Sequence, residues 1–196
     1  MDVLFPHTAA AGIELRATAP STGRQVYARL SALGLTGIPP EDEFAAGSLW
    51  PGRPFAEIPG RFTAERPAPP AHFSVVHSGD GREIGHAALC EVSPHGGHAK
   101  ACVAVDTAAG GGALAAATVL TVNYAFAVWR IRKVYFWTTG RTVPGLADVP
   151  DAAVEEAVLP DHVRVGGGLR PARVFAVYRD RWEATGAPAA ERLAAG

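Results

Sequence analysis

The sequence predicts one α/β domain in which helices flank a mixed β-sheet. Segments with the two-residue alternation of strands come both before and after segments with helical spacing, which is the order that such a sheet produces. The 196 residues fit a single domain of ordinary size, and 48% of them are hydrophobic, which is enough for a buried core. We therefore expect a twisted, mostly antiparallel sheet of six or seven strands.

The first expected elements are a strand and a capped helix. Apolar and polar residues alternate over residues 12–19, as in a half-buried strand. Apolar residues then have helical spacing over residues 22–33, and Ser21 or Thr22 is the expected cap of this helix. Residues 39–70 hold eight of the 16 prolines together with scattered aromatic residues. Such a composition does not form regular sheet, so we expect a packed lid there.

The later elements follow clearer signals. Glycine-containing turns separate strand-like segments, and the long helix is built of Ala, Leu and Val without internal Gly or Pro. The expected elements are strands at 72–78, 83–92 and 98–106, a helix at 113–127, and strands at 132–138 and 174–178. Since the end of the chain has no pattern of its own, we expect a domain at 1–185 and a flexible tail at 186–196.

Composition excludes several classes of protein. The 18 basic and 19 acidic residues nearly balance, which disfavours nucleic acid as a partner. No apolar run is long enough for a membrane span or a signal peptide, so we expect a cytoplasmic protein. Cys90 and Cys102 fall in neighbouring strands, as reduced packing thiols would. His95 and His98 lack a nearby third ligand, so we expect no metal site. A homodimer is compatible with the sequence.

A run of three glycines lies between an expected strand and the long helix. Gly110, Gly111 and Gly112 remove side chains just where the first N–H groups of the helix can converge on an anion. No lysine follows as in a Walker loop, and the spacing is not GxGxxG. The pattern indicates a diphosphate or phosphate site, and a plain connection is the alternative.

The order of motifs around these glycines resembles the GNAT acyltransferase superfamily. A hairpin reads Glu83-Ile84-Gly85-His86, the turn carries Gly110 and Gly112, and the helix ends in Tyr124-Ala125-Phe126. The strand Arg132 to Phe136 comes next, and the match extends over roughly residues 83–182. Within the superfamily, the resemblance is to the branch of ribosomal-protein and polyamine N-acetyltransferases.

The resemblance implies an N-acyltransferase. Its co-substrate would be acetyl-CoA, another acyl-CoA or a phosphopantetheine thioester on an acyl carrier protein. The acceptor would be a primary amine of a small molecule, as in secondary metabolism. The backbone of Val103 and Val105 would pair with the pantetheine amides. The residues implied to hold the pyrophosphate are Gly110, Gly111, Gly112, Ala113 and Leu114.

This chain departs from the family at three places. Ala109 and Ala116 stand where the family carries polar side chains, and residues 138–149 contain neither Asn nor Tyr. A donor bound to a carrier protein, or a non-catalytic domain that binds a thioester or a protein partner, therefore remains an alternative to free coenzyme A. The cationic residues that we expect to meet a carrier are Arg130, Arg132, Lys133 and Arg141, for which ordinary surface solubility is the other interpretation.

Two residues are candidates for the catalytic base. Glu91 ends a hairpin strand, and His98 opens the strand expected to hold the thioester. Each could instead be an exposed residue without a catalytic role. We expect His86 to be a hydrogen-bonded core residue and Asp106 to cap the turn that follows its strand.

Overall fold

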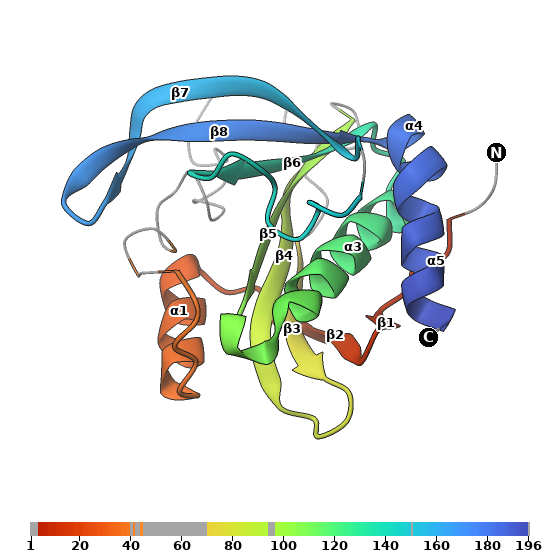
Figure 1. The fold of residues 1–196 in the computed structure, drawn as a ribbon, viewed down its shortest axis with the longest axis horizontal. Coiled ribbons are helices and arrows are strands. Elements are labelled where there is room, and N and C mark those ends of the chain that lie inside the picture. Colours follow the sequence, from red (N-terminus) through yellow and green to blue (C-terminus); the bar gives the residue numbers. More distant parts are fainter. Residues whose placement is uncertain are drawn as a thin grey trace, which may run out of the picture.

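The computed structural model describes residues 4–39, 41, 44, 70–93, 97–149 and 151–195. These residues form one eight-stranded sheet with helices on both faces (Figure 1), which confirms the α/β class and the mixed sheet. The sheet has slightly more strands than the six or seven expected. The strand order is β1-β2-β3-β4-β5-β6-β8-β7, and every pairing is antiparallel except that of β5 with β6.

The elements of the first half agree closely with expectation. They are β1 (Ala9–Ala10), β2 (Ile13–Thr18), α1 (Gly23–Ala32), β3 (Ala71–His77), β4 (Glu83–Ser93) and β5 (His98–Val105). Thr22 is the N-cap of α1, because its hydroxyl accepts from the Gln25 N–H while the Gln25 side chain accepts from the Thr22 N–H. This reciprocal pair is a capping box, typically worth about 1 kcal/mol.

The second half contains the long helix and the end of the sheet. Its elements are the 3₁₀ turn η2 (Thr107–Ala109), α3 (Gly111–Val128), β6 (Lys133–Thr138), β7 (Ala153–Val165), β8 (Gly168–Tyr178) and α4 (Arg179–Arg181). A π-helical turn, η3 (Trp182–Gly186), leads into α5 (Ala187–Ala195). The described helices include none that is long and apolar enough to cross a membrane.

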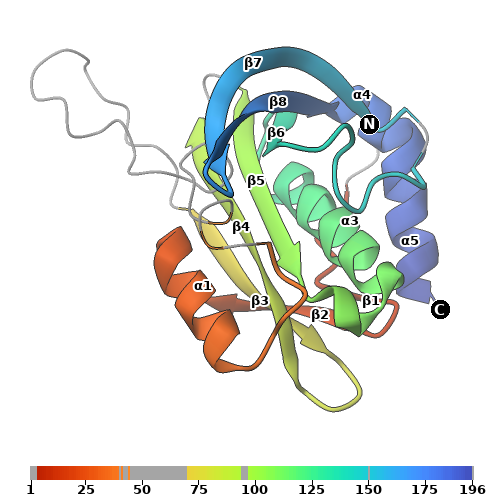
Figure 2. The ribbon, with the colours of Figure 1, turned by 60° about the vertical axis from the view of Figure 1, so that its left-hand side comes forward.

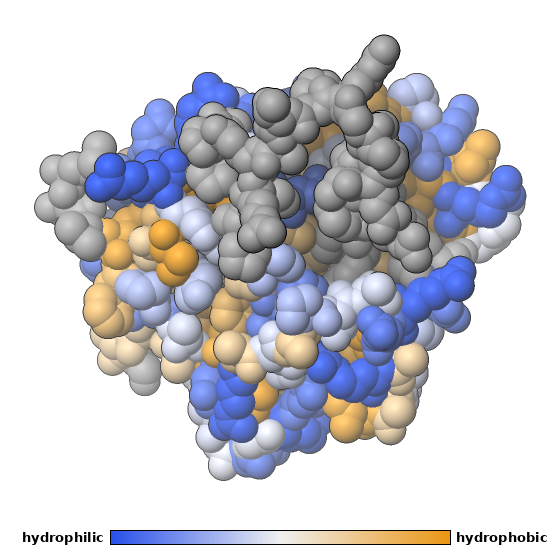
Figure 3. All heavy atoms as spheres, turned by 180° about the vertical axis from the view of Figure 1, so that it is seen from behind, coloured by the Kyte–Doolittle hydropathy of each residue, from blue (hydrophilic) through white to orange (hydrophobic). Residues whose placement is uncertain are grey.

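The sheet separates two helical layers. In Figure 2 α1 lies on one side of the sheet, and α3 and α5 lie on the other. Along β5 the alternation of side chains follows this arrangement: Ala101 and Val105 pack in the α3 core, whereas Cys102 and Ala104 pack with α1. Viewed from behind, hydrophilic residues are interspersed with hydrophobic ones over the described surface (Figure 3).

The last hairpin is longer than the sequence predicts. We expected a strand only from residue 174, but β8 begins at Gly168 and pairs with β7 over nearly its whole length. Pro171 is tolerated because β6 pairs with β8 only from Arg173 onward, so a missing N–H costs no bond to β6 there. The hairpin therefore extends beyond β6 and arches over the neighbouring strands (Figures 1 and 2).

The chain end also differs from the expected flexible tail. Residues 187–195 form α5, in which Ala187 and Ala190 are buried and Leu193 packs against the main core. The carbonyl of Leu193 accepts a hydrogen bond from the Ala11 N–H at 3.0 Å. The end of the chain thus covers α3. Most of the expected lid at 39–70, and the turn at 94–96, lie outside the described residues.

Candidate functional site

The two parallel strands at the centre of the sheet separate part-way along. Pairing of β5 with β6 runs from His98 and Lys133 to Ala101 and Phe136 and stops there. On its other edge β5 continues to pair with β4 as far as Val105. Residues 102–105 therefore present one backbone edge to the space between β5 and β6, which we call the split. Such an edge can bind an extended chain of amide groups as an added strand.

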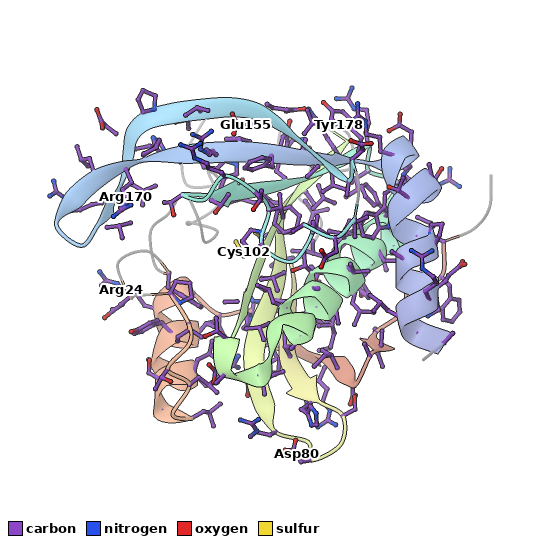
Figure 4. All side chains as sticks on the ribbon, viewed as in Figure 1. Arg24, Asp80, Cys102, Glu155, Arg170 and Tyr178 are labelled. Atoms are coloured by element: carbon purple, nitrogen blue, oxygen red, sulfur yellow. The ribbon has the colours of Figure 1, made fainter. Side chains whose placement is uncertain are left out.

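A cavity of about 140 Å³ occupies the split. It is lined by Ala101, Cys102, Val103 and Ala104 of β5, by Phe136, Trp137 and Thr138 of β6, and by Pro39, Phe44 and Pro144. Cys102, labelled in Figure 4, marks its position. The wall combines side chains from both faces of the sheet, since Phe136 packs in the α3 core and Cys102 packs with α1. The structure thus places Val103 in this wall and Val105 further along the same open edge.

The glycine loop leads from β5 to the first turn of α3. Gly110 has φ +94°, a conformation that side chains rarely adopt, and no side chain of the described residues caps the helix there. Apart from its immediate surroundings in the chain, a Cβ added at Gly110 or Gly112 would meet no atom of the described residues within 4 Å. The loop therefore has open space in front of the N–H groups and positive dipole of α3, as an anion requires.

Two contacts fix the surroundings of the loop. Asp106 is 5% exposed, and its carboxylate accepts from the N–H groups of Gly37 (3.0 Å) and Ala108 (3.1 Å), which confirms its capping role. On the opposite side Thr118 donates to the Pro144 carbonyl at 3.1 Å. A Cβ at Gly145 would lie 2.7 Å from the Leu114 carbonyl, so only glycine lets this loop approach α3 so closely.

The face of the sheet away from α3 carries charged and aromatic groups beside the split. Glu91 lies at a bulge of β4 with φ +49°, and its half-exposed carboxylate is 3.9 Å from the Lys100 ammonium. The Lys100 side chain is only 5% exposed and lies 4.7 Å above the Trp137 ring. A non-glycine residue in the left-handed region is strained, and such strain is often found at functional sites. Trp137 therefore connects this charged pair with the cavity.

His98 is further from the cavity. Its ring lies 5.8 Å from that of Tyr135, close to the start of β6. Beside it the Lys133 ammonium donates to Glu156 at 3.0 and 3.2 Å, and Tyr178 donates to the same carboxylate. Partial burial on its own raises the pKa of the Glu156 carboxyl. Hydrogen bonds from Tyr178, Lys133 and Tyr135 together outweigh this effect, so the pKa lies below its usual value. Of the two candidate bases, neither lines the cavity, and Glu91 is linked to it through Lys100 and Trp137.

A second polar cluster lies under α1 and is structural. His86 is fully buried and accepts at Nδ1 from the Arg29 guanidinium at 2.8 Å, since arginine can only donate. Its proton is therefore on Nε2, which faces His72 Nδ1 at 3.3 Å. Burial, with the charges of Arg29 and His72, lowers the pKa of His86 to about 3. The expectation of a hydrogen-bonded core histidine is confirmed.

The cysteines are buried thiols without a disulfide. A hydrogen bond with Cys102, together with burial, raises the pKa of the Cys90 thiol well above 9, so this thiol is a poor nucleophile. In the described part of the chain no three His, Cys, Asp or Glu residues gather as metal ligands would. His95 lies outside that part.

The four cations expected to meet a carrier protein do not form one cluster. Arg130 and Arg132 follow the C-terminal end of α3, about 27 Å along the helix from the glycine loop. Lys133 is bound to Glu156, and exposed Arg141 follows β6, in the loop that packs near Leu114. Of these four residues, only Arg141 belongs to the loop that reaches the N-terminal half of α3, through Gly145.

Sequence reasoning missed Lys100 as a site residue. One signal was available: it is one of two lysines in the chain and interrupts an otherwise apolar strand, between Ala99 and Ala101. Its position at the split depends on the pairing of β5 with β6, which the sequence does not show.

The chain is similar in fold to solved structures of acetyltransferases. The chain superposes on a GCN5-related N-acetyltransferase from Brucella melitensis with a TM-score of 0.53 and 21% identity, covering 63% of this chain and 57% of that one. For RimJ of Mycobacterium smegmatis in complex with CoA-disulfide, the TM-score is 0.52 and the identity 22%, over 61% of this chain and 57% of that one. For a chimera of the spermidine N-acetyltransferase SpeG from Vibrio cholerae and hSSAT, the TM-score is 0.58 and the identity 15%, over 88% of this chain and 99% of that one.

The chain has the GNAT fold. This confirms the fold that the motif order of the sequence implied. The chain spans 57% of the Brucella and Mycobacterium proteins, and all three identities are below 25%. No protein-family model and no curated protein matches the sequence. Within this fold, the split offers an open strand edge and the glycine loop offers the uncapped N-terminus of α3.

Proposed function

We propose that the protein is an N-acyltransferase that moves an acyl group from a pantetheine thioester to the primary amine of a small molecule. The observation that carries this proposal is the split between β5 and β6, continuous with the uncapped start of α3. The open edge at Val103 and Val105 suits the amides of a pantetheine arm. The N–H groups at Gly110, Gly111, Gly112, Ala113 and Leu114 suit its phosphate or diphosphate.

The reaction needs alignment and the removal of one proton. A thioester at the inner end of the split would lie beside Ala101 and Phe136, where an amine can reach it from the α1 side. Glu91 is our first candidate to take the proton of the amine, because its carboxylate lies on that side near the cavity. His98 is the second candidate.

Binding and turnover are the two tests. A ligand that binds only the native state raises the melting temperature, so millimolar coenzyme A or an acyl-CoA should do so. A panel of acyl thioesters and primary amines, followed by mass spectrometry, should show an amide product.

If Glu91 is the base, Glu91→Gln lowers kcat by about 10²- to 10⁴-fold with unchanged donor affinity, and His98→Ala does not. The reverse pattern assigns the role to His98.

A non-catalytic thioester-binding domain is the second candidate. Residues 138–149 contain no tyrosine that could protonate the leaving thiolate. Coenzyme A would then raise the melting temperature, but no combination of thioester and amine would give product.

Charge reversal near the glycine loop distinguishes a carrier-bound donor from free acyl-CoA. Ala109 and Ala116 provide no hydrogen bonds to a diphosphate, and Ala116 is 1% exposed, so its position faces the core. A carrier protein would meet Arg141 rather than Arg130 or Arg132. If the donor is carrier-bound, Arg141→Glu lowers kcat/KM for acyl carrier protein and leaves that for acyl-CoA unchanged, whereas Arg130→Glu changes neither. A preference for coenzyme A that both variants retain rejects the carrier.

A further inference from the structure

The inner end of the split is the place where β5 and β6 cease to pair. Ala101 and Phe136 are the last residues that pair with each other. Cys102 and Trp137 occupy the next positions along the two strands, and all four residues line the cavity. The two residues of β5 are small, whereas the two residues of β6 are large and aromatic. The room at this end of the cavity is therefore set by β6.

The two aromatic residues lie on opposite faces of the sheet. Phe136 is 5% exposed and belongs to the main core, on the α3 side. Trp137 follows it in the strand, so its side chain is on the α1 side, and it is only half-buried. Because core residues fill the α3 side, an acyl group at the inner end of the split extends toward α1. Trp137 forms the wall in that direction.

Two neighbours hold the ring of Trp137. The Lys100 ammonium of β5 lies 4.7 Å above the ring, and the ring of His162 on β7 lies 5.9 Å away with an interplanar angle of 55°. A cation over the ring and a second ring beside it each favour one orientation of the indole. The indole is thus held from two strands and forms a wall of defined position.

Tyr135 provides the contrast on the same face of β6. It lies two residues before Trp137, so both side chains are on the α1 side of the sheet. The Tyr135 ring is 5.8 Å from the ring of His98 and 4.8 Å from the Lys133 ammonium, and it does not line the cavity. Of these two aromatic residues, only Trp137 meets the cavity.

The volume of the cavity limits what fits beside Trp137. The cavity measures about 140 Å³, which is close to the size of an apolar protein cavity that holds one benzene molecule. If the proposed function is right, the end of the pantetheine arm takes part of this space and the acyl group takes the rest. A long acyl chain fits only if the indole is displaced.

We propose that Trp137 determines the length of the acyl group, because its indole closes the inner end of the split to long chains. This proposal rests on the proposed function and goes further, since it assigns the choice of donor to one side chain. Removing the indole enlarges the space for the acyl group. It leaves the open edge at Val103 and the glycine loop as they are.

The experiment is a series of donors of increasing chain length. Acetyl-, butanoyl-, hexanoyl- and octanoyl-CoA are each offered with the primary amine that gives most product in the panel, and kcat/KM is measured. A pocket of defined size discriminates one methylene by about 10- to 200-fold. We therefore expect the wild type to prefer acetyl-CoA to hexanoyl-CoA by about tenfold or more.

Variants assign this preference to Trp137. Trp137→Ala should raise the ratio of kcat/KM for hexanoyl-CoA to that for acetyl-CoA by about 10- to 100-fold, and Trp137→Phe should raise it less. Tyr135→Ala is the matched control, because it removes an aromatic ring from the same face of β6 outside the cavity. It should leave the ratio unchanged.

Binding gives a second readout that needs no acceptor. Acetyl-CoA should raise the melting temperature of the wild type more than octanoyl-CoA does, and Trp137→Ala should remove or reverse this difference. Coenzyme A, which has no acyl group, should shift the wild type and Trp137→Ala equally. The wild-type series and Trp137→Phe decide the question even if Trp137→Ala does not fold.

The outcomes separate this proposal from the proposed function. If the thioesters bind and turn over but the wild type uses octanoyl-CoA as well as acetyl-CoA, the role of Trp137 is rejected and acyl transfer stands. The same holds if folded Trp137→Ala keeps the wild-type preference, or if Tyr135→Ala changes it as much. If no thioester binds, both proposals are rejected.

Discussion

The two ends of α3 differ in the side chains that contact their free backbone groups. At the C-terminal end the Arg179 guanidinium donates to the carbonyls of Phe126, Trp129 and Ile131 at 2.7 to 2.8 Å. At the N-terminal end Gly110 has no side-chain cap, and the first turn carries no acidic residue among the described positions. Both ends of a helix leave backbone groups without helical partners. Among the described residues, a side chain binds the backbone groups at the C-terminal end of α3 and none does so at the N-terminal end.

This difference supports the position proposed for the phosphate of the donor, at the N-terminal end of α3. An arginine at the C-terminal end matches the negative end of the helix dipole and makes that end part of the fold. The N-terminal end has no such side chain among the described residues, as the proposed phosphate site requires. Mutations at the two ends should therefore have separable effects, on stability at one end and on binding at the other.

The largest expected effect is on stability, at the C-terminal end. Arg179→Leu removes hydrogen bonds from a charged donor to three carbonyls and should lower the free energy of unfolding by about 3 to 4 kcal/mol. Chemical denaturation measures this loss. Coenzyme A affinity of the folded fraction should stay unchanged, and a matching loss of affinity would show that the two ends are not independent.

The next effect is on binding, at the N-terminal end. Gly112→Asp brings a carboxylate into the open space before the helix and should weaken coenzyme A by about 100-fold or more through repulsion of the phosphate. Its stability should not fall, because an acidic residue in a first turn favours the helix. Calorimetry on the variant measures the affinity, with Gly112→Ala as the uncharged control. Equal affinity of Gly112→Asp and wild type would exclude the loop from the site.

The smallest of the three expected effects is a change of stability with pH, and it involves His86, away from α3. The pKa of His86 is about 3 in the folded protein and near 6.5 when unfolded, so the unfolded state binds more protons below pH 6.5. Its contribution to stability is present above pH 6.5 and is lost as the pH falls toward 3, by about 2 kcal/mol between pH 7 and pH 5. Denaturation at both pH values should show this loss. His86→Gln should reduce the pH dependence, whereas Arg179→Leu should not, because arginine does not titrate there.

Local signals in the sequence predicted the elements whose ends are marked by particular residues. Thr22 and its capping partner mark α1, and the glycine loop marks the start of α3. The β7–β8 hairpin was underestimated because Pro160 and Pro171 look like strand breakers. Their positions are tolerated because β7 is an edge strand and β8 extends beyond β6. Pro188 likewise concealed α5, which is stabilised by packing on the core rather than by local sequence.

The candidate site was predictable only in part. The glycine loop was predicted from its own residues, and the edge at Val103 and Val105 only through the resemblance to the GNAT superfamily. The group around Lys100 and Trp137 depends on which strands become neighbours. Residues 37 positions apart meet there because a parallel crossover places β6 beside β5. Spacing in the sequence carries no such information.

Hydrogen exchange tests the central claim most directly, because it reads both ends of α3 in one experiment. On addition of coenzyme A, the account predicts slower exchange for the amides of residues 102–105 and 111–114 and no change for residues 126–131. Protection at the C-terminal end of α3 instead, or no protection at either end at millimolar ligand, would contradict it.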